Sequence, residues 1–403
     1  MNAVRIGALL LTAATAASAQ QFRFEDVVRN LRNPDPKTRL AAVRLLRDAK
    51  YPEAIAPMAP LVLDPADEIQ LEAIAAELGF FLNQDVRTKK MVAFVVEKRV
   101  SGIALAAFEL GPLVVWPRAV PEELVTSLLQ AVDDESPKVR LEAMYAVGVV
   151  AKPPLTPDQH VRLVKALDHY DPMIRSGAAR VIGRHKFPAT GDALIKAVND
   201  SNAEVRYAAM RALGAIREER AAPALNEQLA FYKKGEGAWS ALDALAHIGS
   251  PASVPTFKER LQDKDPFIRR AAVEGLGRAG DASAADAIER MVTTDDSPMV
   301  RVASAFMLQK IGRNYASRII DLMGNAKVIP QAQEYLIELG PVALTAVVPR
   351  LQEPDAAVRE ALADVLGVIG DPSALPALES ATKDREDSVA AAAKRALARL
   401  GAS

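Results

Sequence analysis

The sequence predicts an all-α protein, a right-handed α-solenoid of about twelve helical hairpins. Three observations predict this fold: a short phrase recurs along the 403 residues, half of the residues are hydrophobic, and only 5% are aromatic. Alanine, leucine, valine and isoleucine must therefore supply most of the apolar volume, which suits thin helices that stack closely. Because 403 residues exceed the usual size of one core, repeated units are expected to extend the chain along one dimension.

The recurring phrase marks the start of a helix. An Asp, Asn or Ser stands first, a proline usually follows, and an arginine comes four residues after the first position. The first residue is the expected N-cap, and a proline at the next position loses no helical hydrogen bond. The expected N-caps are Asp35, Ser136, Asp171, Asn202, Asp265, Ser297 and Asp355. The arginines are Arg39, Arg140, Arg175, Arg206, Arg269, Arg301 and Arg359.

The spacing of the phrase defines the hairpins. Arg140 and Arg175 lie 35 residues apart, and Arg269 and Arg301 lie 32 apart, so the two longer intervals 206–269 and 301–359 each hold one degenerate repeat. A first helix is expected before many of the phrases, at 121–132, 156–167, 191–198, 251–261, 282–291 and 372–381. Further degenerate units are expected near 67–70, 103–111, 239–249, 330–340 and 387–401. One hairpin cannot bury its apolar face alone, so neighbouring hairpins must stack.

The arginines predict a structural ladder. Each arginine lies one turn into its helix and points back toward the N-terminus of that helix. An acid often stands two residues before the cap, as at Asp134, Asp200, Asp263, Asp295 and Glu353. We expect each arginine to bond such an acid, or a loop carbonyl, in its own or the adjacent repeat. A solvated surface arginine is the alternative.

The phrase resembles a known repeat. The pattern Asp-x-x-Val-Arg-x-x-Ala-x-x-Ala-Leu-Gly is matched almost throughout by residues 202–214. It resembles HEAT repeats, specifically the short HEAT-like class named after phycobilisome lyases, and the resemblance covers most of residues 22–403. The resemblance implies an armadillo-type solenoid, and it implies little about function.

The N-terminus has the pattern of an export signal. A basic start containing Arg5, a short apolar run from Ile6 to Ala17 and small residues before Gln20 predict a signal peptide at 1–19 that is cleaved after Ala19. Residues 20–403 are expected to form one continuous solenoid domain, located in the periplasm or secreted. The chain has no cysteine, so it offers no lipid-attachment cysteine, and it contains no long apolar run that would span a membrane.

The charge balance argues against nucleic acid as a partner. The formal net charge is −1, so no excess of positive charge is present to neutralise phosphates.

The sequence offers no recognisable catalytic or metal-binding motif. His160, His169, His185 and His247 show no ligand spacing, and we expect surface or loop histidines, no metal and no cofactor. HEAT-like repeats also occur in a di-iron hydroxylase family, in which repeated His-Glu pairs hold the metal. The four histidines here are instead followed by Val161, Tyr170, Lys186 and Ile248.

One repeat departs from the phrase and is the best candidate for a partner contact. It replaces the expected cap and arginine with aromatic, basic and glycine residues. The candidate residues are Phe231, Tyr232, Lys233, Lys234 and Trp239, with Trp116 in a proline-flanked loop as a weaker candidate. Aromatic and basic residues are typical interface anchors, although a tolerated irregular loop is the alternative.

The sequence therefore predicts an exported, non-catalytic scaffold that binds a protein or peptide partner on its extended surface. The first alternative is a HEAT-like enzyme, of the lyase or metal-dependent hydroxylase or oxidoreductase type, with a site in the concave groove. The second alternative is a structural component of a cell-envelope complex.

Overall fold

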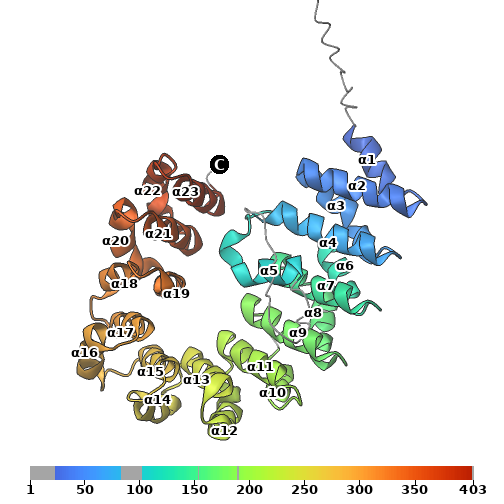
Figure 1. Cartoon of the computed structure of the whole chain (residues 1–403). Coiled ribbons are helices and arrows are strands. Elements are labelled where there is room, and N and C mark those ends of the chain that lie inside the picture. Colours follow the sequence, from blue (N-terminus) through green and yellow to red (C-terminus); the bar gives the residue numbers. More distant parts are fainter. Residues whose placement is uncertain (1–22, 83–101, 153, 188–189, 402–403) are drawn as a thin grey trace, which may run out of the picture.

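The protein is an all-α solenoid (Figure 1). The structure is a computed structural model that describes residues 23–82, 102–152, 154–187 and 190–401. In these ranges the chain forms no β-strand, and its one isolated bridge joins Leu82 to Val115. No helix in the same ranges is both long enough and apolar enough to cross a membrane. The predicted fold class is confirmed, whereas the predicted signal peptide lies outside the described residues.

The helices form consecutive hairpins. Their first helices are α1 (Phe24–Asn30), α3 (Ile55–Met58), α6 (Glu122–Ala131), α8 (Pro157–Lys165), α10 (Gly191–Ala197), α12 (Ala222–Tyr232), α14 (Val254–Arg260), α16 (Ala285–Thr294), α18 (Ala316–Leu322), α20 (Leu344–Val347) and α22 (Leu375–Ala381). Their second helices are α2 (Pro36–Ala49), α4 (Asp67–Phe81), α7 (Pro137–Val150), α9 (Pro172–His185), α11 (Ala203–Ala215), α13 (Gly235–Ile248), α15 (Pro266–Arg278), α17 (Pro298–Lys310), α19 (Ile329–Leu339), α21 (Ala356–Ile369) and α23 (Asp387–Arg399). An additional helix, α5 (Ile103–Leu110), stands between two hairpins.

Short 3-10 helices extend or precede several of these elements. They are η1 (Pro52–Ala54), η2 (Ala59–Leu63), η3 (Pro112–Val114), η4 (Ala166–Asp168), η5 (Glu219–Ala221), η6 (Pro251–Ser253), η7 (Ala326–Val328), η8 (Gly340–Ala343), η9 (Val348–Gln352) and η10 (Pro372–Ala374).

Helix α15 illustrates how the phrase builds a helix. The side chain of Asp265 accepts a hydrogen bond from the backbone N–H of Phe267, and Pro266 follows the cap. Ile268 and Leu276 face the core and are buried. Gly280, just after the helix, has a φ of +70°, a left-handed conformation that glycine adopts without steric cost. Cap, apolar stripe and terminator thus lie within one repeat.

The second helices stack on one another and line the inner side of the curve. α9 contacts α11, α11 contacts α13, and α13 contacts α15. From α11 onward the second helices face the centre of the ring-like curve, whereas the first helices lie outside (Figure 1). One continuous core of buried apolar side chains extends along this stack, from Val27 in the first hairpin to Ala396 in the last.

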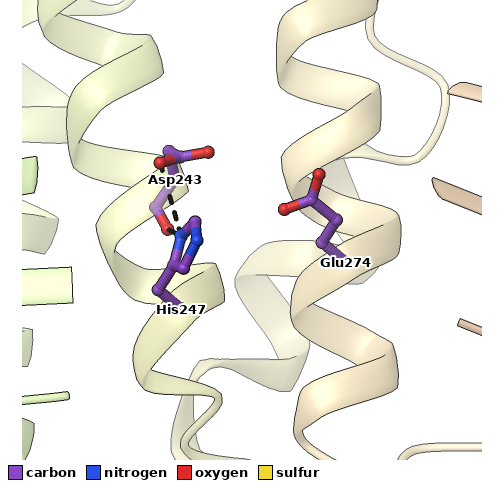
Figure 2. Close-up of side chains that lie close together, drawn as sticks. All are labelled: Asp243, His247 and Glu274. Atoms are coloured by element: carbon purple, nitrogen blue, oxygen red, sulfur yellow. Dashed lines mark hydrogen bonds and ion pairs between the residues drawn. The ribbon is translucent and has the colours of Figure 1, made fainter. Parts of the chain in front are cut away.

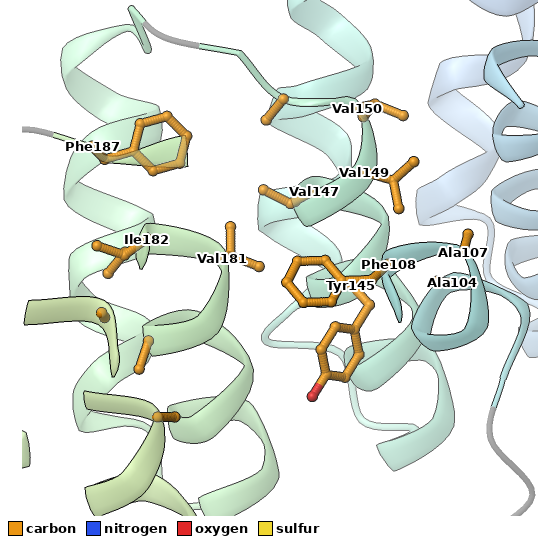
Figure 3. Packing of buried hydrophobic residues seen from close by; sticks show 14 of the residues in the cluster. Ala104, Ala107, Phe108, Tyr145, Val147, Val149, Val150, Val181, Ile182 and Phe187 are labelled. Carbon is orange, nitrogen blue, oxygen red and sulfur yellow. The ribbon is translucent and has the colours of Figure 1, made fainter. Parts of the chain in front are cut away.

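Helix α5 adds a layer on the inner side of this stack. Phe108 of α5 lies 5.3 Å from the ring of Tyr145 on α7, measured between ring centroids, and both pack near Val181 of α9 (Figure 3). The seat for Phe108 requires a glycine at position 148, because a Cβ atom there would lie 2.5 Å from the phenyl ring.

The curve brings the two halves of the chain together. Arg399, at the end of α23, donates a 2.7 Å hydrogen bond to the backbone carbonyl of Leu113 in η3. Figure 1 shows α23 beside the segment that follows α5. The solenoid therefore closes into one turn.

Candidate functional site

The ladder arginines bind aspartates of the following repeat. Arg175 donates from Nε and one terminal nitrogen to Asp200, at 2.7 and 2.8 Å, and from the other terminal nitrogen to the carbonyls of His169 and Tyr170. Three further arginines make the same two-pronged contact, pairing Arg39 with Asp64, Arg269 with Asp295 and Arg359 with Asp384. These side chains are mostly buried.

In other repeats, side chains other than an arginine and an aspartate make the polar contact between neighbouring hairpins. Arg206 donates to the hydroxyl of Tyr232 at 2.6 Å, and the indole N–H of Trp239 donates to Asp265 at 2.6 Å. Gln70 fills the arginine position in α4 and donates to Asp134. Around residues 231–239 the hydroxyl of Tyr232 thus takes the place of a ladder aspartate, and the indole of Trp239 makes the polar contact from α13 to the next interhelical turn.

The remaining predicted positions differ in detail. Arg140 bonds the carbonyls of its own turn and reaches Asp171 at 3.4 Å. Arg301 bonds only the carbonyl of Asp295 within the described chain. Asp35, Asp171, Asn202, Asp265 and Asp355 cap their helices through the side chain. Ser136 and Ser297 stand at the cap but make no such bond.

The residues that are predicted to contact a partner differ in how far they are exposed to solvent. Phe231 is 72% exposed, and Lys233 and Lys234 are exposed, whereas Tyr232 and Trp239 are only partly exposed. Trp116 is partly buried and donates its backbone N–H to the carbonyl of Phe81. Partner binding by these residues stays a prediction.

A polar junction between α13 and α15 was not predicted from the sequence. Eight residues after the ladder position most repeats carry a glycine, namely Gly148, Gly183, Gly214, Gly277 and Gly367. In α13 the corresponding position is Ala246, and His247 follows it, at the place that Arg278 occupies in α15. Asp243, one turn earlier, and Glu274 of α15 lie beside His247, and one possible ligand atom of each lies within 4.8 Å of the others (Figure 2).

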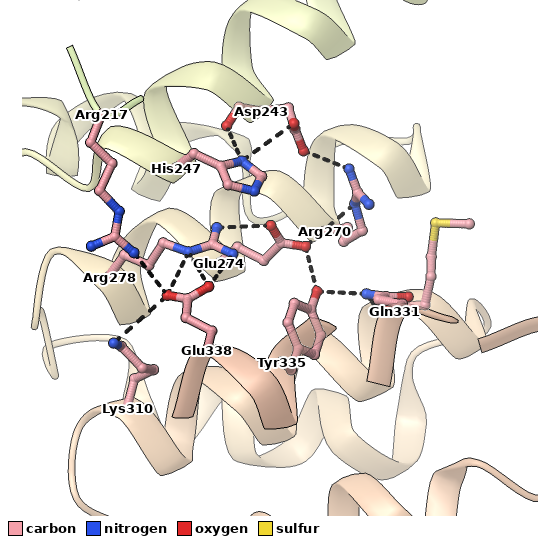
Figure 4. Close-up of polar contacts among 11 residues, drawn as sticks. Arg217, Asp243, His247, Arg270, Glu274, Arg278, Lys310, Gln331, Tyr335 and Glu338 are labelled. Carbon is pink, nitrogen blue, oxygen red and sulfur yellow. Dashed lines mark hydrogen bonds and ion pairs between the residues drawn. The ribbon is translucent and has the colours of Figure 1, made fainter. Parts of the chain in front are cut away.

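A network of charges surrounds these three side chains (Figure 4). Arg270 donates to Asp243 at 2.7 Å, and Arg278 donates to Glu274 at 3.0 Å. Tyr335 of α19 donates its hydroxyl to Glu274. Glu338 of the same helix accepts from Arg278 at 2.9 Å. The junction therefore ties α13, α15 and α19 together through polar contacts.

The network sets the ionisation of its members. Burial opposes ionisation of Asp243, but the charges of His247 and Arg270 outweigh it and hold the pKa of the carboxyl well below its usual value. Burial also disfavours the charged form of His247, yet Asp243 raises the pKa of the imidazole above 6.5. His247 Nδ1 lies 2.9 Å from the carbonyl of Asp243 and 3.4 Å from its carboxylate.

The junction is a poor match for a resident iron centre. The resemblance to the di-iron hydroxylases implies adjacent His-Glu pairs, which the sequence lacks. Asp243, His247 and Glu274 supply a different donor set, and its two carboxylates already bind Arg270 and Arg278. A metal ion would have to displace those guanidinium groups, so we derive no metal chemistry from this cluster.

The histidines also differ from the expectation. His169 has a side chain only 8% exposed, His185 donates from Nε2 to the carbonyl of Gly148 at 2.8 Å, and His247 lies in α13. The expectation of surface or loop histidines is thus wrong for His185 and His247, which are partly buried within helices. The signal in the sequence is that α13 carries Asp243 and His247 at the places where α15 carries Glu274 and Arg278.

A second feature of the inner side is a cavity of about 560 Å³ between α5, α9, α11 and α13. We call it the inner-face pocket. Its charged and aromatic lining consists of Phe108, Glu109, Arg180, Arg184, Glu204 and Arg211, together with Glu236.

Two pocket arginines are held by α5. The guanidinium of Arg184 lies over the ring of Phe108, 3.3 Å from its centroid, and donates to the carbonyl of Phe108. Arg180 binds Glu109 and donates to the hydroxyl of Tyr145 at 3.0 Å. Burial and the charge of Arg180 lower the pKa of Arg184 to about 10. The volume of the inner-face pocket, about 560 Å³, is within the range of ligand sites in proteins.

Stacked helical hairpins with an arginine ladder define an α-solenoid of the HEAT type. The family model of HEAT repeats matches residues 161–230, 235–309 and 313–398. The chain belongs to the HEAT-repeat family, as the sequence analysis predicted.

One curated relative is an enzyme. The chain is 29% identical over 205 residues to deoxyhypusine hydroxylase of Arabidopsis thaliana, a match that covers 49% of this chain and 65% of the relative. The match thus spans slightly less than two thirds of that relative's length. The prediction of a chain without enzymatic activity is contradicted by this comparison, because the matching relative is a hydroxylase.

Solved structures with related folds include two HEAT-like enzymes. The complex of CpcE and CpcF of phycocyanin lyase from Nostoc sp. PCC7120 is 22% identical, with a TM-score of 0.38, and the match covers 62% of this chain and 88% of that one. Human deoxyhypusine hydroxylase in complex with glycerol is 20% identical, with a TM-score of 0.29, and the match covers 70% of this chain and 97% of that one.

Proposed function

We propose that the protein is an exported HEAT-repeat protein that binds a protein or peptide segment on the inner side of its solenoid. The observation that carries this proposal is the inner-face pocket, which lies on the stacked second helices and presents arginine and phenylalanine side chains. The stack holds these side chains before a partner arrives. Little ordering entropy then remains to be lost on binding, which favours affinity.

Export rests on the N-terminal pattern and on the absence of cysteine. Intact-mass analysis of the protein from separated periplasm and cytosol of its native host tests this step. We expect the periplasmic or secreted fraction to contain a chain that begins at Gln20. A chain retained in the cytosol with residues 1–19 attached would contradict export.

The binding site is tested by charge reversal. After crosslinking in the native host, the captured proteins are identified for the natural chain and for the double variant Arg180→Glu with Arg211→Glu. We expect the specific partner to be lost from this variant. The control reverses two charges on α8 and α10, the first helices of their hairpins, Arg162→Glu with Lys196→Glu, and keeps the partner. Equal capture by both variants would contradict inner-side binding.

A second candidate function is enzymatic. The similarity to deoxyhypusine hydroxylase favours it, and the His247–Asp243 pair could accept or donate a proton through the imidazole. The test incubates the purified protein with a protein that carries deoxyhypusine, using the Arabidopsis enzyme as a positive control. Addition of one oxygen atom, abolished by His247→Gln, would support this candidate, and an unchanged substrate mass would reject it.

A further inference from the structure

We propose that the inner-face pocket binds a carboxylate group of a peptide, with Arg184 as its anchor. This inference rests on the proposed partner binding and specifies the chemistry that the partner presents. The inference depends on Arg184, which differs from the other two arginines of the pocket in its contacts.

Arg184 lacks a carboxylate partner within the described part of the chain. Its contacts are the ring and the backbone carbonyl of Phe108, although the guanidinium is only partly exposed. The other two pocket arginines are paired, Arg180 with Glu109 and Arg211 with Glu236. Arg184 is partly removed from water, and the charge of Glu109, which forms its ion pair with Arg180, offsets this cost only in part. An anionic ligand would supply the missing partner.

The ion pairs beside Arg184 are exposed enough for a ligand carboxylate to replace one of their glutamates. The side chain of Glu109 is 58% exposed, and those of Arg211 and Glu236 are 50% and 46% exposed. Exposed ion pairs contribute little to stability, so an incoming carboxylate can replace Glu109 or Glu236 at small cost. Arg180 and Arg211 can therefore join Arg184 in holding the ligand.

The shape and charge of the pocket favour a peptide carboxylate. A guanidinium presents two parallel N–H groups that match the two oxygens of a carboxylate. Small apolar residues also line the cavity, namely Ala179, Gly183, Ala208, Ala212 and Ala215, and they leave room for an aliphatic chain beside the charge. Three glutamates balance the three arginines of the lining, which disfavours a multiply charged phosphate.

The probe is a fluorescent, acetylated and amidated heptapeptide of alternating glutamate and leucine, and its counterpart has glutamine for glutamate. Binding is measured by anisotropy. We expect the acidic peptide to bind about tenfold or more tightly than the neutral one, and Arg184→Gln to remove that advantage. Arg162 on α8 is paired with Asp158 and does not line the inner-face pocket, so the control Arg162→Gln should bind like the natural protein.

Three results would overturn the assignment. They are equal binding of the two peptides, absence of binding, and acidic-peptide binding that survives Arg184→Gln. Inorganic phosphate that displaces the peptide at a lower concentration than acetate would assign the pocket to phosphate and also overturn it. Arg211→Gln, at an exposed position, serves as a second variant if Arg184→Gln fails to fold, and it should weaken acidic-peptide binding severalfold.

The outcomes separate this inference from the proposed function. If no peptide binds but the native partner is still lost on charge reversal at Arg180 and Arg211, the carboxylate assignment fails and inner-side binding stands. If the native partner is unaffected by that charge reversal, the proposed function itself fails.

Discussion

The guanidinium of a ladder arginine makes hydrogen bonds to two neighbouring hairpins. Arg175 joins the carbonyls of its own interhelical turn to Asp200 in the next turn, and Asp200 in turn accepts from the backbone N–H of Asn202. Charged hydrogen bonds that are largely shielded from water contribute more than exposed pairs. The ladder therefore fixes how one hairpin sits on the next.

Removing such an arginine should destabilise the solenoid. We expect Arg175→Ala to lower the free energy of unfolding by about 2–3 kcal/mol, because Asp200 and two carbonyls lose their partner. Urea unfolding followed by circular dichroism measures the change. Arg162→Ala, which breaks an exposed pair on α8, should change the free energy by less than about 0.5 kcal/mol. Equal effects of the two substitutions would contradict the ladder.

Glu77 is the least favourable residue of the described core. It is 2% exposed, and within the described ranges neither carboxylate oxygen has a hydrogen-bond partner. It stands seven residues after Gln70, where the corresponding positions of other repeats hold Leu213 and Leu276. Burial raises the pKa of the Glu77 carboxyl well above its usual value.

The raised pKa of Glu77 makes stability dependent on pH. The folded protein binds more protons than the unfolded chain between the unfolded pKa of about 4.3 and the higher folded pKa, so stability falls as pH rises through that window. We expect Glu77→Leu to stabilise the protein by about 1–3 kcal/mol near neutral pH, and by less near about pH 4.5. Urea unfolding at both values measures this, and a gain independent of pH would contradict the assignment.

At the scale of the helices, glycines allow the second helices to approach closely. A Cβ atom on Gly214 would lie 2.7 Å from the Cα atom of Ala244 on the next helix, and one on Gly367 would lie 2.6 Å from the Cα atom of Ala396. Backbone atoms cannot move aside as a flexible side chain can. The repeated glycine is therefore a requirement of stacking.

A matched pair of substitutions tests this requirement. Alanine is the better helix former by about 1 kcal/mol, yet Gly214→Ala should lower the free energy of unfolding by about 1–3 kcal/mol because α11 and α13 must separate. An added Cβ on Gly79 in α4 would meet no atom of the described chain within 4 Å, so Gly79→Ala should stabilise by about 0.5–1 kcal/mol. Thermal unfolding of both variants measures the difference. Destabilisation by both would point to a cause other than helix contact.

The local phrase explains how much of the architecture could be predicted. Caps, apolar stripes and terminators depend on neighbours in sequence, so helices such as Pro266–Arg278 follow from the residues alone. The roles of Tyr232 and Trp239 depend on which side chain each meets in a neighbouring hairpin, Arg206 or Asp265, and no local pattern records this. The junction of Asp243 and Glu274 and the seat of Arg184 on Phe108 arise likewise between elements distant in sequence.

At the scale of the whole molecule, the curve is closed by a contact between the last helix, α23, and η3, which follows α5. Arg399 binds the carbonyl of Leu113 and lies 3.4 Å from Asp364. We expect Arg399→Ala to open the curve and raise the radius of gyration measured by small-angle X-ray scattering. Lys394→Ala, at an exposed position on the same helix, should leave it unchanged. An equal radius for both variants would show that closure does not depend on this contact.

The closed curve gives the molecule an inner and an outer side, and the central claim is that the inner side binds the partner. Site-specific photocrosslinking in the native host tests it most directly, with the photoreactive residue at Glu204 or at Glu227. Both glutamates are exposed; Glu204 lines the inner-face pocket, whereas Glu227 lies on the outer helix α12 (Figure 1). We predict a discrete covalent adduct from position 204 and none from position 227, and an adduct only from position 227 would contradict the account.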